Sequence, residues 1–182
     1  MARKDSKSVW GIYPSRLSVE TAIDRLRENR FLSSDISVLL PENLGPKELI
    51  TEKSTKAPEG AAAGAGSGVL IGGALGWLAG IGAFTLPGVG AFIAAGPLMA
   101  ALAGAGVGGV IGGIGGALVG AGIPEYEAKR YEGRLTKGGI LISVHCDKSE
   151  EIAHAKEILR RTGGEDISVS AEEPTYAAKA GD

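Results

Sequence analysis

The chain has 182 residues, a single cysteine and nearly balanced charge, with 19 basic and 21 acidic residues. This length allows one compact domain with an insertion, and the single cysteine excludes an internal disulfide. Balanced charge provides no overall positive field for nucleic acid, so we expect no nucleic-acid partner. Glycine is in excess: 21 of the 30 glycines lie within residues 61–123, a stretch that contains no Asp, Glu, Lys or Arg.

The first predicted element is a β-α-β unit at residues 8–41. It begins with an apolar run typical of a strand, VWGIY at 9–13, and continues with apolar residues at helical spacing after Ser18. The tetrapeptide DISV at 35–38 predicts its second strand. One such unit exposes half of a core, so a second unit must complete the sheet. Residues 42–60 are polar and interrupted by prolines, which predicts a linker.

The uncharged block at 61–123 carries two rows of glycines spaced four residues apart, the pattern of a glycine zipper. Glycine in a water-exposed helix costs ~1 kcal/mol relative to alanine, so the rows predict helices that pack backbone to backbone. We therefore expect the rows to be the site of helix packing and self-association. They are Gly64, Gly68, Gly72, Gly76 and Gly80, followed by Gly104, Gly108, Gly112, Gly116 and Gly120.

The length of the block predicts a helical hairpin that crosses a membrane. Residues 61–82 and 97–123 each suffice to span ~30 Å of hydrocarbon. Residues 82–96 are interrupted by Pro87, and we expect them to form the hairpin tip with a short interfacial or re-entrant helix. Two crossings return the chain to one side, and flanking basic residues place that side in the cytoplasm. The expected location is the bacterial cytoplasmic (inner) membrane, with the lipid bilayer as a partner.

A short amphipathic helix is predicted at 124–138, opened by a proline. Its apolar residues, Ala128, Tyr131 and Leu135, are expected to cover the open face of a sheet or to lie along a membrane surface. Glu125 and Glu127 fall in its first turn, where the helix dipole favours negatively charged side chains.

A second β-α-β unit at 139–172 repeats the pattern of the first. The apolar run ILISVHC is followed by a helix start at Ser149 and by DISV at 166–169. Residues 173–182 are predicted to be a loose tail.

Together the two units predict an α+β fold: a ferredoxin-like βαβ…βαβ domain split by a long Gly/Ala-rich α-helical hairpin. Strand alternation assigns side chains to the two faces of its sheet. The residues expected to face the two helices are Ile36, Val38, Ile167 and Val169. The residues expected on the other face are Ser37, Ser168 and Ser170. That face is left open, so two domains could pair back to back across it.

Few residues suggest chemistry. The G-x-G-x-x-G pattern at Gly104, Gly106 and Gly109 lacks the preceding strand of a dinucleotide loop. Trp10 and Tyr13 are expected to pack in the sheet, and Trp77 to contact lipid or another helix. Four residues are candidate metal ligands, but adjacent strand positions point to opposite faces, which opposes a shared site. They are His145, Cys146, Asp147 and His154. We expect no enzyme activity, no cofactor, no metal and no small-molecule substrate.

The first unit, SVWGIYPSRLSVETAIDRLRENRFLSSDISVLLPE, resembles bacterial heat-induced or general-stress proteins of the YflT-like type. The resemblance extends to the glycine-rich middle, which reads as a transmembrane insertion, and to the GIPEYEAKRYEGRLTKGGILISVH passage that follows it. It covers most of the chain and includes no catalytic motif. It implies a stress-associated bacterial protein and carries over no functional residues.

The leading hypothesis is a non-enzymatic, self-associating structural membrane protein, a homo-oligomer assembled through its glycine-zipper helices and a cytoplasmic ferredoxin-like domain. One alternative is a pore-forming or leak-type channel, although no charged residue lies in the spans. Another is a soluble filament or shell, in which zipper helices of many chains bury one another without lipid. A small-ligand sensor has only fold analogy in its favour.

Overall fold

Two segments far apart in the sequence form the middle of one six-stranded antiparallel sheet. The computed structural model describes residues 6–44, 75, 78, 81–86, 90–98 and 113–171, which form an α+β fold with four α-helices. The strand order is β3-β4-β2-β5-β1-β6, and the predicted α+β class is confirmed. The strands are β1 (Lys7–Tyr13), β2 (Ile36–Pro41), β3 (Gly82–Leu86), β4 (Gly90–Ala95), β5 (Ile140–Cys146) and β6 (Glu165–Ala171).

Strand β5 comes from the second half of the chain and lies between β1 and β2 of the first half. Val144 of β5 is opposite Val9 of β1 on one side and opposite Ile36 of β2 on the other. Each half therefore needs the other to form its sheet, as the repeated pattern predicted.

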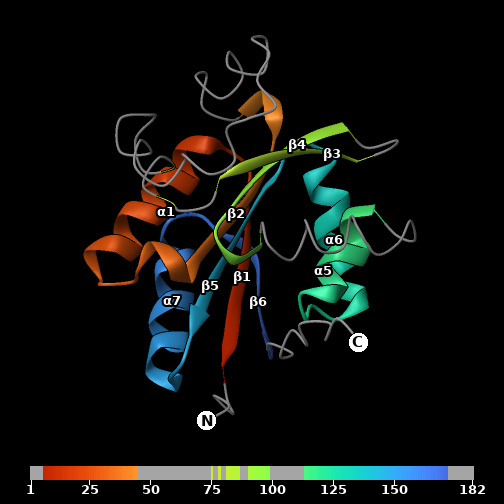
Figure 1. Cartoon of the computed structure of the whole chain (residues 1–182). Coiled ribbons are helices and arrows are strands. Elements are labelled where there is room, and N and C mark those ends of the chain that lie inside the picture. Colours follow the sequence, from red (N-terminus) through yellow and green to blue (C-terminus); the bar gives the residue numbers. More distant parts are fainter. Residues whose placement is uncertain are drawn as a thin grey trace, which may run out of the picture.

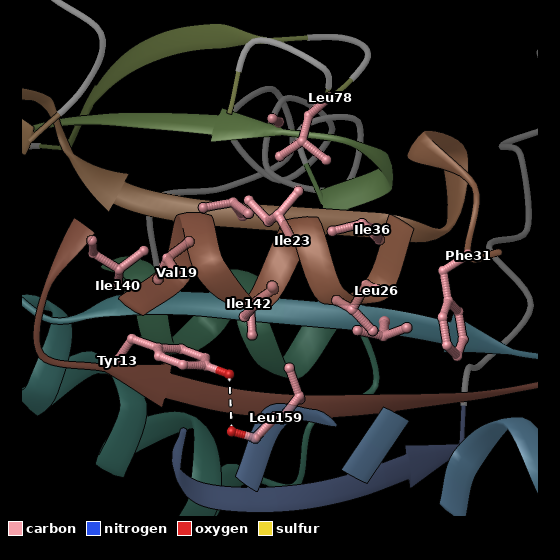
Figure 2. Close-up of a cluster of buried hydrophobic side chains, with 14 of the residues drawn as sticks. Tyr13, Val19, Ile23, Leu26, Phe31, Ile36, Leu78, Ile140, Ile142 and Leu159 are labelled. Atoms are coloured by element: carbon pink, nitrogen blue, oxygen red, sulfur yellow. Dashed lines mark hydrogen bonds between the residues drawn. The ribbon is translucent and has the colours of Figure 1, made fainter. Parts of the chain in front are cut away.

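Helices α1 (Arg16–Glu28) and α7 (Ser149–Arg161) cover one face of this sheet (Figure 1). Both bury the apolar stripe that their sequences predict. Tyr13 lies among the side chains of this first core, and its hydroxyl donates a hydrogen bond to the carbonyl oxygen of Leu159 at 3.1 Å (Figure 2). The residues of the first core that come from these helices and the four central strands include Val9, Tyr13, Val19, Ile23, Leu26, Ile36, Val38, Ile140, Ile142, Val144, Ile158 and Leu159.

The two helices begin by different local means. Helix α1 begins earlier than predicted, because Ser15 is its N-cap and accepts a hydrogen bond from the backbone N–H of Ser18 at 3.3 Å. Helix α7 begins at Ser149 as predicted. Its Glu151 carboxylate accepts from the backbone N–H of the N-cap residue, Lys148, at 3.3 Å and from that of Asp147 at 2.9 Å.

The middle of the uncharged block forms a β-hairpin, so the predicted helical tip at 82–96 is wrong. Strand β3 pairs with β4, and β4 pairs with β2, where Ile93 is opposite Leu40. Glycine is required where β4 ends: Gly96 has a φ of +77°, and a β-carbon there would lie 2.1 Å from the carbonyl oxygen of Ile36. The apolar run satisfies its backbone polar groups by extending the sheet, not by forming helix.

Helices α5 (Gly113–Gly120) and α6 (Glu125–Leu135) cover the opposite face of the sheet (Figure 1). The predicted amphipathic helix thus covers the sheet, and the expectation of an open face for back-to-back pairing is wrong. Between these helices and the strands lies a second core. It comprises Trp10, Ile12, Leu39, Phe92, Ala94, Leu98, Ile114, Ala117, Leu118, Ile123, Ala128, Tyr131, Leu135 and Leu141.

The serines predicted on this second face lie there and form hydrogen bonds. Ser37 accepts a hydrogen bond from the backbone N–H of Leu98 at 3.1 Å. Ser170 accepts one from the indole N–H of Trp10 at 2.7 Å. These bonds offset the cost of burying hydroxyls beneath apolar side chains.

The predicted membrane-spanning hairpin is wrong. Within the described ranges, no helix has both the length and the apolar character needed to cross a bilayer. The segment expected to span at 97–123 contains α5, which has only eight residues, and the preceding segment leads into strand β3. The expected location in the inner membrane is wrong for the same reason. Most of 61–80 and all of 99–112 lie outside the described residues, as do Trp77, most of the linker and the tail.

The two DISV tetrapeptides have different structural roles. Asp35 ends a 3₁₀ turn, Ser33–Asp35, and its carboxylate accepts from the backbone N–H of Leu32 at 3.1 Å. Asp166 instead lies in a bulge of β6, where the register with β1 shifts, and its φ is +50°. The repeat therefore predicts both strands correctly, but not the different backbone conformations at the two aspartates.

Candidate functional site

Helix α5 has one buried and one exposed side. Ile114, Gly115, Ala117 and Leu118 are buried against the second core. The remaining four positions of the helix are exposed: Gly113, Gly116, Val119 and Gly120. We call these four residues the outer face of α5. Three of its four members are glycines, so the helix presents its backbone there almost without side chains.

Two of the ten glycines predicted to pack lie on this outer face. Gly116 and Gly120 are exposed, and a β-carbon at Gly120 would have no neighbouring atom within 4 Å. In the described part of the chain, Gly120 therefore has no contact that requires a glycine. The other eight predicted positions, and the G-x-G-x-x-G pattern, lie outside the described residues.

Helix α6 holds α5 in place through a carboxylate. The oxygens of Glu132 lie 3.0 Å from the position of a β-carbon at Gly113 and 2.8 Å from that at Gly115. Both glycines belong to the first turn of α5, where the helix dipole favours a negative group. Gly115 thus serves contacts within the chain, whereas Gly116 and Gly120 face away from it.

Helix α6 is in turn fixed to the sheet by a buried tyrosine. The hydroxyl of Tyr131 donates to the carbonyl oxygen of Asp166 at 2.6 Å and shares a hydrogen bond with Ser168 at 2.9 Å. Burial raises the pKa of Tyr131 to about 12, and the bond to Ser168 partly opposes this rise. The phenol therefore remains a neutral donor over the physiological range.

Ion pairs supplement this attachment at the start of β6. Arg130 and Arg134 both pair with Asp166, the latter at 3.5 Å, and Arg134 also pairs with Glu165. The Asp166 side chain is only 14% exposed, so this network is less accessible to solvent than an isolated surface pair. The outer face of α5 is thus carried by a helical hairpin that is anchored to the sheet.

Two large apolar side chains are exposed on the same hairpin. Val119 of the outer face is 42% exposed, and Tyr126 in the first turn of α6 is 77% exposed. The hairpin therefore exposes both glycine backbone and apolar side chains to solvent. A contact with another protein would bury such a surface.

A separate polar pocket gathers three of the four candidate metal ligands. Nε2 of His145 lies 3.3 Å from Oδ1 of Asp147, and the ring of His154 lies at a tilt to Phe31, with 6.3 Å between centroids. Cys146 is buried in the first core instead. In the part of the chain that the structure describes, no three His, Cys, Asp or Glu residues are grouped to hold a metal ion. The pocket has a volume of about 220 Å³ and is lined by Asn29, Arg30, Phe31, Asp35, His145, Asp147, Glu151 and His154.

Sequence reasoning did not identify Glu132 or Asp166. Glu132 lies on the polar side of a helix. The sequence gives no sign that it contacts Gly113 and Gly115, because a loop separates α5 from α6. Asp166 follows Gly163 and Gly164, a pair that signals a turn, but its pairing with α6 depends on the tertiary fold.

Comparison with protein-family models, with curated proteins and with solved structures finds no match for this chain. The resemblance to heat-induced stress proteins therefore stays a prediction, and function must be argued from the surfaces described above.

Proposed function

We propose that this chain is a non-enzymatic structural protein that assembles with copies of itself through the outer face of α5. The observation that carries the proposal is the exposure of Gly116 and Gly120, which continue the four-residue glycine spacing. Among the described residues, no atom lies near enough to Gly120 to require a glycine there. Close packing against an equivalent helix would give these positions a physical role.

The energetic argument starts from helix propensity. Each exposed helical glycine costs up to about 1 kcal/mol relative to alanine, and α5 has two of them, Gly116 and Gly120, on one side. Two such helices can approach with their backbones in contact, gaining dispersion and weak Cα–H···O interactions. Val119 and Tyr126 would add apolar area to the same contact, since both are exposed on the α5–α6 hairpin.

We further infer a ferredoxin-like core as the scaffold that presents this hairpin. Four strands in the order β2-β5-β1-β6, with α1 and α7 over one face, support this assignment. The assembly would be a filament or shell made of protein alone, and a role in bacterial stress follows from the resemblance of the sequence.

The experiment is replacement of Gly116 and Gly120 by leucine in the full chain, with size measured by gel filtration and light scattering. A β-carbon at 120 has no described atom within 4 Å, and Gly116 is exposed, so both variants should fold and gain helix stability. We expect the assembly to dissociate or shrink, because leucine separates the helix backbones.

Gly133→Leu is the matched control. Gly133 is an exposed helical glycine of α6, and a β-carbon there also has no neighbour within 4 Å. This control should keep the size of the assembly. Unchanged assembly in Gly116→Leu and Gly120→Leu, or a monomeric unmodified chain, would rule out the proposed contact.

A further inference from the structure

The second surface of interest is the free edge of the sheet at β6. In the described part of the chain, β6 pairs with β1 along one side only, and it ends the strand order. Such an edge presents unpaired backbone groups that can accept another strand, and proteins usually protect it with lysine, proline or inward charge. The sequence of β6, EDISVSA, contains neither lysine nor proline.

The two acidic residues of β6 do not protect this edge. Both lie at the start of the strand, and both are paired with arginines of α6. The bulge lies between Glu165 and Ser168, so residues 168–171 pair regularly with β1, and Ile167 next to them completes the uncharged part of the strand. This uncharged part is the segment available to a partner.

We propose that residues 167–171 pair antiparallel with the same residues of a second copy of this chain, across a two-fold axis at Val169. Side-chain pairing supports this register. Val169 would face its own equivalent, Ile167 would face Ala171, and Ser168 would face Ser170, so that apolar residues meet on one face of the sheet and hydroxyls on the other. Residues 167–171 contain no charged side chain, so no like charges are opposed within the paired segment.

Burial favours this occupant as well. Ile167 and Val169 are only partly buried and pack at the side of the first core. A neighbouring strand would cover them with Ala171 and Val169 of the second copy and extend the core across the axis. Helices α7 and α6 flank β6 on opposite faces, so both can add buried area to the contact between the strands. A stable interface buries roughly 1,200 Å².

This interface goes beyond the proposed function, since it shares no residue with the outer face of α5. Two different self-matching contacts on one chain would alternate and build an open chain of protomers, whereas either contact alone would give a closed dimer. The β6 contact thus provides the second link that a filament needs.

The test is disulfide formation between single cysteines in a Cys146→Ala background. It is made in the Gly116→Leu/Gly120→Leu chain, so that the α5 contact does not contribute. On a denaturing, non-reducing gel, Val169→Cys should shift from monomer to dimer after mild oxidation, because residues opposite one another lie within disulfide reach. Ile167→Cys should not, because four residues of strand, ~13 Å, separate it from its equivalent.

A mixture of Ile167→Cys with Ala171→Cys should form the mixed dimer, which fixes the register. As a second measurement, Val169→Lys should lose the dimer with unchanged circular dichroism, whereas Val169→Thr should keep it. The proposal is overturned if Val169→Cys stays monomeric on oxidation. It is also overturned if Ile167→Cys dimerises as readily as Val169→Cys.

Discussion

The Glu132 carboxylate lies so close to Gly115 that a β-carbon on residue 115 would stand 2.8 Å from Oε2. This contact brings α6 against the first turn of α5. It also explains why residue 115 is a glycine although it lies outside the four-residue zipper spacing. The uncharged block therefore contains glycines of two kinds, those that fit the fold of one chain and those that face outward.

We predict that the effect of Gly115→Ala on stability depends on Glu132. In the unmodified chain the methyl group displaces the carboxylate, which cancels the gain in helix propensity. In a Glu132→Ala background the conflict is absent, and Gly115→Ala should stabilise by about 0.5–1 kcal/mol. Urea unfolding of the four chains of this double-mutant cycle measures the coupling. Equal effects of Gly115→Ala in both backgrounds would show that the two residues do not interact.

A second prediction concerns alkaline pH. Burial raises the pKa values of Tyr13 and Tyr131 to about 12 in the folded protein, against an ordinary value of 10.0. Their contribution to stability is therefore complete below pH 10 and is lost between pH 10 and about 12, because the unfolded chain releases these protons first. The free energy of unfolding should therefore fall with pH by about 1.4 kcal/mol per pH unit for each tyrosine, as the linkage of protonation to folding requires.

Urea unfolding at intervals from pH 9 to pH 12 checks this expectation. Tyr131→Phe should cost about 1 kcal/mol at neutral pH, since it removes the bonds to Asp166 and Ser168, and should make the alkaline slope shallower. Tyr126→Phe is the control, because Tyr126 is 77% exposed and should leave the slope unchanged. A slope that is the same in Tyr131→Phe would contradict the burial of this phenol.

A third prediction tests the position of the β3–β4 hairpin. At Gly96 a β-carbon would lie 2.1 Å from the carbonyl oxygen of Ile36 and 2.9 Å from Cα of Ser37, and backbone atoms cannot rotate away. Gly96→Ala should therefore destabilise the chain by several kcal/mol or displace the hairpin from β2. Gly90→Ala is the matched control, because Gly90 also has positive φ but no neighbour within 4 Å.

Thermal unfolding of both glycine variants, together with hydrogen exchange of the β2 amides, measures this difference. Gly90→Ala should cost only the backbone strain of about 1–2 kcal/mol. Equal losses in the two variants would mean that β4 does not approach β2 as closely as described.

The repeated DISV strands and the two helical stripes made the central sheet predictable, because each is a local pattern of apolar spacing. The β3–β4 hairpin was not, since GAFTLPGVGAFIAAG has no polar alternation and lies between glycine rows that suggest helix. Gly116 and Gly120 illustrate the same limit at the candidate site. Their spacing predicts close packing. Only the burial of Ile114 and Leu118 on the inner side of α5 reveals that the glycines face outward.

The last prediction concerns the length of chain between the two halves. Leu39 of β2 is paired with Leu141 of β5, so β2 ends and β5 begins at the same end of the sheet. A short turn of about four residues should therefore replace residues 42–138 without disturbing the order β2-β5-β1-β6 of the remaining strands. The shortened chain loses β3, β4, α5 and α6, and with them the cover of the second core.

Uncovering Leu39 and Leu141 forfeits about 1.5–3 kcal/mol of burial for each side chain. Ile93 and Ala95 are also lost from the first core, so the shortened chain should be less stable. We expect it to retain helix and sheet by circular dichroism and to associate through the bare sheet face in gel filtration. Adding Leu39→Thr and Leu141→Thr, together with Val169→Lys to block the β6 contact, should return it to a monomer. An unfolded chain in both forms would show that the middle segment is required for the sheet, and a stable monomer without the threonines would show that the α5–α6 layer covers no apolar surface.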